Sequence, residues 1–152
     1  MAKKLSETKG RIYNSRARFD YELGDSFVVG LQLTGAETKS LRFGNGDLRG
    51  AYVNVLGDEL WLVNAKINGT KGIPIVEEQV TRSRKLLAKR SEIEKLVNAR
   101  QAGNTIVPLE LITRGRYIKL KIAVGRGKKK YDKRETLKKR QEERDIGREI
   151  KL

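Results

Sequence analysis

Hydrophobic and polar residues alternate in several short stretches of the chain. The first stretch covers Phe27–Leu33, and a second covers Ala51–Val55. A turn signal at Gly57–Asp58 separates the second stretch from a third, Glu59–Ile67, whose predicted inward residues are Trp61, Val63, Ala65 and Ile67. A period of two is typical of strands with one buried face, and a Gly-Asp turn between two such runs predicts a β-hairpin.

Two further strands are predicted near the end of the hydrophobic part of the chain. Thr105–Ile112 and Tyr117–Val124 flank a polar turn at 113–116. The second of them has one apolar face, made of Ile118, Leu120, Ile122 and Val124. Its other face carries Tyr117, Lys119 and Lys121. One face is therefore expected to be buried and the other to meet solvent or a ligand.

Two stretches depart from the alternating pattern and predict helices. Gly35–Arg42 is short and has a helix-compatible composition. Arg84–Val97 carries apolar residues on one helical face, and Gly103 follows as an end signal. Five to seven short strands with two to three short helices predict a mainly β fold (α+β by content). The expected architecture is an OB-like closed antiparallel β-barrel.

The hydrophobic pattern ends at Val124, so we predict a barrel domain over residues 1–124 and a tail over 125–152. Aliphatic residues are sparse in the tail, which is too polar to fold by its own burial, and we expect it to be disordered in the free protein. It also carries helix signals: Asp132 and Glu135 resemble a helix start, and Glu135 and Lys139 form an i,i+4 pair. We therefore expect the tail to become helical on a polyanion.

The charge of the chain indicates what kind of partner it binds. The chain has 34 Lys and Arg against 19 Asp and Glu, a net charge of +15. The tail holds +6 of it, from twelve basic and six acidic residues, and +9 lies on residues 1–124. Such an excess opposes compaction unless a polyanion neutralises it. Nucleic acid is the commonest partner of this kind.

Two absent residue types restrict the chemistry. The chain has no Cys and no His, so it lacks thiolate nucleophiles, zinc–thiolate sites and the commonest general base and metal ligand. We expect no enzyme activity, no cofactor and no metal. Asp20 and Glu22 could hold Mg²⁺ in a nuclease, but solvated ion pairs are the better interpretation. No apolar stretch reaches signal-peptide or membrane-spanning length, which predicts a cytoplasmic protein without a membrane partner.

Basic residues in four separate segments are the candidate phosphate ligands of the predicted barrel. They are Arg16, Arg18, Lys39, Arg42, Arg82, Arg84, Lys85, Lys119 and Lys121. Aromatic residues are few, which favours recognition of a folded RNA by shape and backbone over stacking on a long single strand. Tyr131 is an exception, because the tail offers no core to bury it. It is either a base-stacking residue or an inert spacer.

Four motifs, in this order along the chain, resemble those of a known family. They are Asn14-Ser-Arg-Ala-Arg18, Leu33-Thr-Gly-Ala-Glu-Thr-Lys-Ser-Leu-Arg42, Thr81-Arg-Ser-Arg-Lys-Leu-Leu87 and Gly127-Lys-Lys-Lys-Tyr-Asp-Lys-Arg134. Together they resemble the SmpB family of bacterial proteins, which partner transfer-messenger RNA (tmRNA, or SsrA RNA) in trans-translation.

The resemblance implies a specific division of labour. The barrel would hold the tRNA-like domain of tmRNA, with an RNA-facing surface that includes Glu37, Lys39, Arg42, Leu87 and Lys119. The tail would enter the mRNA channel of a stalled ribosome, become helical there and contact 16S rRNA. Tyr131 would stack in the decoding centre, within a matched motif made of Gly127, Lys128, Lys129, Asp132, Lys133 and Arg134. Elongation factor Tu, acting through the tmRNA complex, is a further implied partner, and a monomer is expected.

Val28 stands where the family has an acidic residue used in RNA binding, and the 68–79 loop departs from the family's pattern. Two alternatives stay open at this point. The first is an OB-type assembly factor that binds ribosomal RNA alone, and the second is a metal-dependent nuclease using Asp20 and Glu22.

Overall fold

The computed structural model describes residues 10–127 and 130–151, and within its last helix the side chains of residues 133–146. In this part of the chain, seven strands form one antiparallel sheet. They are β1 (Arg11–Tyr13), β2 (Tyr21–Leu31), β4 (Tyr52–Leu56), β5 (Glu59–Val63), β7 (Arg84–Leu87), β8 (Thr105–Ile112) and β9 (Lys119–Gly127). Two short strands, β3 (Gly46–Asp47) and β6 (Lys66–Ile67), pair with each other.

The last strand of the large sheet, β9, pairs back with β8, the second strand of the order. The order is β1-β8-β4-β5-β7-β2-β9, and β8 pairs in addition with β9. Six strands therefore follow one another in a ring, while β1 lies outside it on β8. The buried aliphatic side chains of these strands, among them Val53, Leu60, Leu86, Ile106 and Leu120, form a single core.

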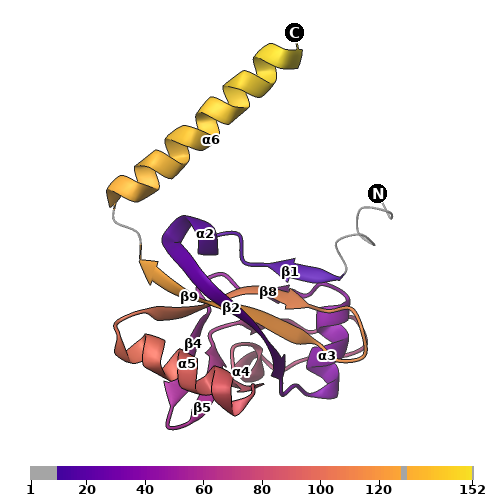
Figure 1. Ribbon diagram of the computed structural model, residues 1–152. Coiled ribbons are helices and arrows are strands. Elements are labelled where there is room, and N and C mark those ends of the chain that lie inside the picture. The colour runs from indigo at the N-terminus through magenta and orange to yellow at the C-terminus, as the bar shows by residue number, and fades with distance from the viewer. Residues whose placement is uncertain (1–9, 128–129, 152) are drawn as a thin grey trace.

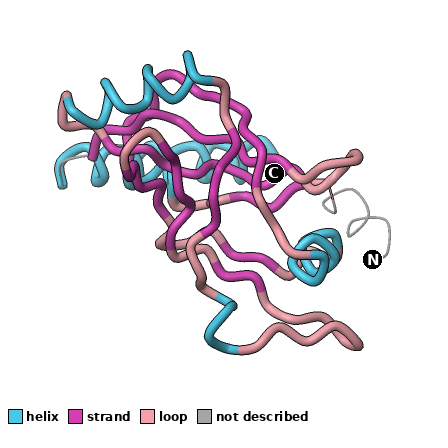
Figure 2. Tube along the Cα trace, turned by 90° about the horizontal axis from the view of Figure 1, so that it is seen from below, coloured by secondary structure: helices cyan, strands magenta, loops and turns pink. Residues whose placement is uncertain are grey.

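Helices lie around the strands (Figure 2). They are α2 (Ala17–Asp20), α3 (Gly35–Arg42), α4 (Glu77–Val80), α5 (Arg90–Gln101) and α6 (Lys130–Lys151). The bounds of α3 are those predicted from the sequence, and the structure shows a capping box at its start. Thr34 Oγ1 accepts from the Glu37 N–H at 3.2 Å, and Glu37 Oε1 accepts from the Thr34 N–H at 3.0 Å.

The hairpin β4–β5 is present, but the predicted inward positions of Trp61 and Val63 are wrong. Leu60 and Leu62 point into the core instead, while Trp61 and Val63 are partly exposed. Ala65 and Ile67 are buried as predicted. The phase changes because Asn64 adopts φ 64°, a left-handed conformation that Asn tolerates better than most residues. This residue ends β5 and shifts the alternation by one position.

The predicted helix over Arg84–Val97 is also wrong in its first half. Residues 84–87 form β7, which pairs with β5 and β2, and α5 begins only at Arg90. A short apolar run such as Leu86–Ala88 fits a strand or a helix equally well until its neighbours are known. Gly103 follows the end of α5 with φ 92°, as its sequence position predicted.

The last strand is longer than predicted, and the tail that follows it is helical. Ile118, Leu120 and Ile122 are buried as predicted, whereas Val124 is only partly buried. The strand begins at Lys119 and continues past Val124 to Gly127, where it pairs with Tyr21 of β2. The tail then forms α6, which projects away from the sheet (Figure 1). Its helical state agrees with the helix signals in the sequence. Disorder of the tail in the free protein stays a prediction.

Candidate nucleic-acid interface

Three neighbouring strands bring four of the candidate residues to one outer face of the sheet. Gly30 of β2 lies opposite Lys119 of β9 on one side and Leu87 of β7 on the other. Residues directly opposite one another in a sheet share a face. In the same way Val28 lies opposite Lys121, and Lys85 lies opposite Trp61 of β5. We call this set of seven residues the outer face; they are Val28, Gly30, Trp61, Lys85, Leu87, Lys119 and Lys121.

Gly30 allows Leu87 to approach the backbone closely in the middle of the outer face. A Cβ at this position would lie 3.3 Å from the Leu87 Cβ, tighter than ordinary contact. Because glycine has no side chain, Leu87 and Lys119 flank bare backbone. Leu87 is 52% exposed and Val28 is 48% exposed, so apolar and cationic groups alternate here on accessible surface.

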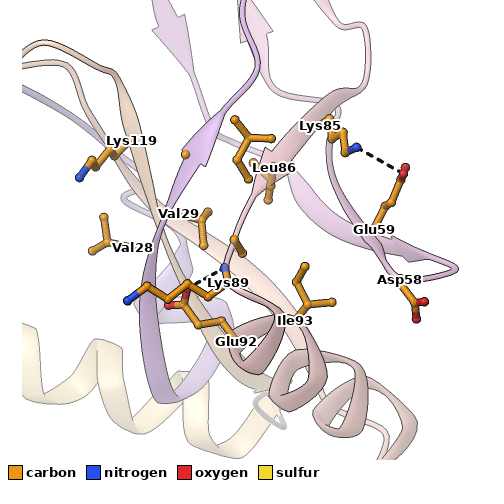
Figure 3. Close-up of a pocket in the computed structure, with 13 residues that line it drawn as sticks. Val28, Val29, Asp58, Glu59, Lys85, Leu86, Lys89, Glu92, Ile93 and Lys119 are labelled. Carbon is orange, nitrogen blue, oxygen red and sulfur yellow. Dashed lines mark hydrogen bonds and ion pairs between the residues drawn. The ribbon is translucent and has the colours of Figure 1, made fainter.

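A hollow of about 590 Å³ opens beside the outer face. Its lining comes from β2, the β4–β5 turn, β7, the start of α5 and Lys119 of β9 (Figure 3). Val29, Leu86 and Ile93 supply apolar groups, and Lys85, Lys89 and Lys119 supply amines. An apolar site with amines around it can take a base or ribose while the amines contact phosphates.

The carboxylates of the hollow lie on its β5 and α5 side. Glu59 Oε1 pairs with Lys85 Nζ at 3.3 Å, and Glu92 Oε1 accepts from the Lys89 N–H at 3.0 Å. Among the described residues, no carboxylate lies within ion-pair distance of Lys119. The positive charge of this surface is therefore strongest toward β9.

Two predicted RNA contacts lie inside the protein. Glu37 and Arg84 have 2% and 0% of their surface exposed, respectively. Arg84 Nε donates to Glu37 Oε2 at 2.7 Å, and its other nitrogens donate to four backbone carbonyls, those of Ala65, Gln79, Val80 and Arg82. Neither side chain is accessible to a phosphate, which corrects their predicted place on the RNA-facing surface.

Arg82 completes this buried cluster from its edge. Its Nε donates to Glu37 Oε2 at 3.1 Å, and a second guanidinium nitrogen donates to Glu37 Oε1. The cluster therefore ties α3, α4 and the start of β7 together. A buried charge must be paired and hydrogen-bonded to be tolerated, and the two arginines and the α3 cap do this for Glu37.

The pKa values follow from these contacts. Burial alone would raise the pKa of Glu37, but hydrogen bonds from Arg82, the Thr34 N–H and Arg84 outweigh it and lower the pKa. For Arg84, burial lowers the pKa, and the Glu37 carboxylate offsets part of this effect. Both groups keep their charge near neutral pH, because Glu37 shifts away from neutrality and an arginine starts far above it.

Arg42 also has a structural role. Its guanidinium donates to the backbone carbonyls of Thr113, Gly115 and Arg116 at 3.0–3.1 Å. It therefore fixes the loop between β8 and β9. Lys39, three residues earlier on α3, is exposed. Of the two basic residues predicted on this helix, only Lys39 leaves its charge fully on the surface.

Arg18 lies on α2 and Arg16 directly precedes this helix, and both side chains are exposed. Arg16 is 3.4 Å from Asp20 Oδ1, and Lys133 of the tail is also 3.4 Å from that oxygen. A residue predicted for the barrel and one predicted for the tail thus meet at one carboxylate. In the remaining tail motif, Gly127 ends β9 and Arg134 is exposed. Lys128, Lys129 and the side chains of Tyr131 and Asp132 lie outside the described residues.

Sequence reasoning missed part of the outer face. Trp61 was assigned to the core, and Gly30 was not singled out. Lys89, which lines the hollow beside this face, was also missed. Register across three strands cannot be read from one strand's alternation, so no local signal identifies Gly30. For Trp61 the signal was Asn64, a residue that favours turns and breaks the alternation.

Both acidic residues of the nuclease alternative take part in surface ion pairs. Asp20 is held by Arg16 and Lys133, and Glu22 Oε2 pairs with Arg126 at 3.1 Å. Within the described residues, no group of three or more acidic, His or Cys side chains could hold a metal ion. The described helices also include none with the length and apolar character needed to cross a membrane.

Comparison with known proteins identifies the family. A family model described as SmpB protein matches residues 11–152. The chain belongs to the SmpB family. An SsrA-binding protein of Trichormus variabilis is 43% identical over 140 residues, which are 91% of this chain and 90% of that protein. A second SmpB relative, the SsrA-binding protein of Streptomyces avermitilis, is 43% identical over 97% of this chain and 85% of its own length.

A solved structure agrees with this family. It is described as tmRNA-SmpB in the center of the bacterial ribosome, and one of its chains matches with a TM-score of 0.67 at 33% identity. The match covers 84% of this chain and 94% of that chain. The mainly β fold with a few helices, predicted from the alternation of residues, is thereby confirmed.

Proposed function

We propose that the chain binds the tRNA-like domain of tmRNA and delivers it to stalled ribosomes in trans-translation. Family membership supplies the RNA class, since its relatives are SsrA-binding proteins. The observation that carries the proposal is the outer face, where Lys119, Gly30 and Leu87 lie in one row across three strands. The exposed apolar groups and amines of this row suit the backbone and shape of a folded RNA.

An OB-like closed β-barrel is the finer description that we propose for the fold. The ring of six paired strands around one core supports it. Barrels of this kind bind oligonucleotides across a face of their strands, and the outer face has that position here. Residues 1–124 would supply most of the barrel, with 125–127 completing β9.

The tail has a separate proposed task. In the decoding centre and mRNA channel it would replace an anticodon stem and a codon, with Tyr131 stacking and the surrounding Gly127, Lys128, Lys129, Asp132, Lys133 and Arg134 contacting 16S rRNA. A tail charge of +6 supports binding to an RNA-lined channel. Elongation factor Tu through the tmRNA complex, a monomeric state and a cytoplasmic location complete the proposal.

An experiment on the outer face tests this function. Affinity for the tRNA-like domain of tmRNA is measured against bulk tRNA and a ribosomal RNA fragment at fixed salt, for the unchanged chain and for Leu87→Asp. We expect a preference for the tRNA-like domain, and we expect Leu87→Asp to weaken its binding. Equal affinity for all three RNAs would favour the ribosomal RNA-binding alternative. Cleavage of the RNA, abolished by Asp20→Asn, would favour the nuclease.

A further inference from the structure

The outer face continues past β9 onto β8 and β1. We propose that three residues there, Arg11, Tyr13 and Glu110, form a second contact for the tRNA-like domain of tmRNA, and we call them the β1 extension. The Tyr13 ring stacks on an unpaired base of the RNA, and Arg11, held by Glu110, contacts a phosphate. Both contacts rest on the proposed function, because they assign further residues to the same RNA.

Strand register places the β1 extension on the same side of the sheet as the outer face. Lys121 of the outer face lies opposite Glu110 of β8, and Glu110 lies opposite Tyr13 of β1. Residues directly opposite one another share a face. Arg11, two residues before Tyr13 in the same strand, points to the same side. Since β1, β8 and β9 run side by side (Figure 1), the surface covers five adjoining strands from β7 to β1.

A bulge in β8 turns Glu110 to this side. Pro108 and Glu110 lie opposite successive residues of β9, so Leu109 is an extra residue in β8. Residues two apart in a regular strand share a face. Because Pro108 lies opposite the core residue Ile122, Glu110 would point into the core without the bulge. Asn14 holds the bulge, since its N–H donates to the Leu109 carbonyl at 2.8 Å and its Nδ2 donates to the Pro108 carbonyl at 2.9 Å. The pairing of β1 with β8 thus maintains the position of Glu110.

Glu110 fixes the Arg11 guanidinium on this surface. Arg11 Nη1 donates to Glu110 Oε1 at 2.8 Å, and the two side chains are 40% and 9% exposed, respectively. The carboxylate is therefore nearly buried, while the arginine stays accessible. A guanidinium has five N–H donors, so its exposed part can donate to a phosphate. A side chain that is already held loses less conformational entropy on binding, which makes Glu110 a positioning residue for Arg11.

Tyr13 is the exposed aromatic residue of the β1 extension. It is 62% exposed, and β1 lies outside the ring of six strands, so this side chain neither closes the barrel nor fills the core. Arg11 lies on the same side of β1, and Lys121 lies in the same row across β8. An aromatic ring with cations around it suits a nucleotide, because the base stacks on the ring while the cations contact phosphates. An unpaired base in a loop of a folded RNA has the accessible face that stacking requires.

The affinity of the full chain for the tRNA-like domain of tmRNA tests the stacking contact. We expect Tyr13→Ala to weaken binding by about five-fold or more, the effect of one lost base stack. Tyr13→Phe keeps the ring and should bind as the unchanged chain does. The matched control is Tyr52→Ala, at a tyrosine of β4 that is 44% exposed, and it should leave the affinity unchanged. Equal affinities of Tyr13→Ala and Tyr52→Ala, or an equal loss in Tyr13→Phe and Tyr13→Ala, would overturn the stacking contact.

A charge-neutral pair of changes tests the phosphate contact. Arg11→Gln combined with Glu110→Gln removes one charge of each sign, so the net charge is unchanged and neither group of the pair is left charged without its partner. We expect weaker binding and a slope of log affinity against log salt that is reduced by about 1. The matched control is Arg49→Gln combined with Asp47→Asn, which removes the same charges from a pair beside the two-stranded sheet. Equal slopes in the two double variants would overturn the phosphate contact.

The variant Leu87→Asp separates failure of the β1 extension from failure of the proposed function. If Leu87→Asp weakens RNA binding while the Tyr13 and Arg11 variants match their controls, the β1 extension is wrong and the proposed function stands. If Leu87→Asp binds the RNA as tightly as the unchanged chain, both are overturned. Unchanged RNA affinity of the Tyr13 and Arg11 variants with weaker binding to ribosomes would assign the β1 extension to another partner and overturn the proposal.

Discussion

Two ion pairs of this protein have the same chemistry and different surroundings. Arg84 and Glu37 are 2.7 Å apart, with side chains 0% and 2% exposed. Lys133 and Asp20 are 3.4 Å apart, with side chains 35% and 31% exposed. The first pair cannot be broken without leaving a charge in the core. The second exchanges readily with water, salt or a phosphate. Burial therefore separates a structural pair from an exchangeable one.

The difference changes the meaning of the +15 net charge. Arg84 and Arg42 contribute to that number but hold the fold through the Glu37 cluster and the β8–β9 loop. Lys119 and Lys39 keep their charges on the surface. A basic residue in this chain can contact RNA only where the fold leaves its amine or guanidinium accessible.

The largest expected effect comes from breaking the buried pair. Arg84→Ala should lower the free energy of unfolding by about 3–5 kcal/mol, because the buried Glu37 loses one of its two guanidinium partners and four backbone carbonyls lose their donor. Urea denaturation measures this. The matched control is Lys85→Ala, which breaks only the half-exposed pair with Glu59 and should cost at most about 1 kcal/mol. Equal losses would mean that burial does not separate the two kinds of pair.

A smaller effect is expected in the pH dependence of stability. The pKa of folded Glu37 lies below its ordinary value of 4.5. Its contribution is therefore complete above pH 4.5 and is lost as the pH falls through the folded-state pKa. Glu37→Gln should be less stable than the unchanged chain at neutral pH, and the gap should narrow on acidification. Urea denaturation across this pH range would contradict the account if the gap widened.

A more modest effect is expected on the outer face. Lys119→Ala should weaken binding to the tRNA-like domain and reduce the slope of log affinity against log salt by about 1, the effect of one lost phosphate contact. Its stability should be unchanged, since the side chain is exposed. Lys71→Ala removes the same charge from an exposed loop and serves as the control. The same slope change in both variants would refute a local contact.

The smallest effect is expected from the exposed pair. Lys133→Ala should change the free energy of unfolding of the folded domain by less than about 1 kcal/mol, because the pair is screened by solvent. The same urea experiment measures it. A loss as large as that of Arg84→Ala would place the tail helix within the stability of the core, which the account excludes.

Local patterns in the sequence were enough to predict much of the fold. The face of β9 formed by Leu120 and Ile122 follows from a period of two, and the bounds of α3 follow from a helix-compatible composition. Contacts between residues far apart in the sequence could not be predicted from such local patterns. Glu37 and Arg84 are 47 residues apart, and nothing local to either indicates that they are buried together. The left-handed Asn64 and the strand β7 likewise depend on tertiary packing.

The candidate site was predicted in part. Four predicted residues lie together on the outer face: Lys85, Leu87, Lys119 and Lys121. The alternation along β9 and the family motif at β7 had indicated them. The prediction of Glu37 as a surface residue came from the family resemblance alone. A motif residue can also be buried beneath a surface and stabilise the elements that form it. Sequence position does not distinguish these two roles.

The central claim is that the folded domain binds the tRNA-like domain of tmRNA, while the tail binds in the decoding centre and mRNA channel of the ribosome. The most direct measurement compares the affinity of the full chain for the tRNA-like domain of tmRNA with that of a chain ending after Gly127, which keeps β9 complete. The account predicts affinities of the same order and a loss of ribosome rescue in the shortened chain. Abolished RNA binding in the shortened chain would contradict it.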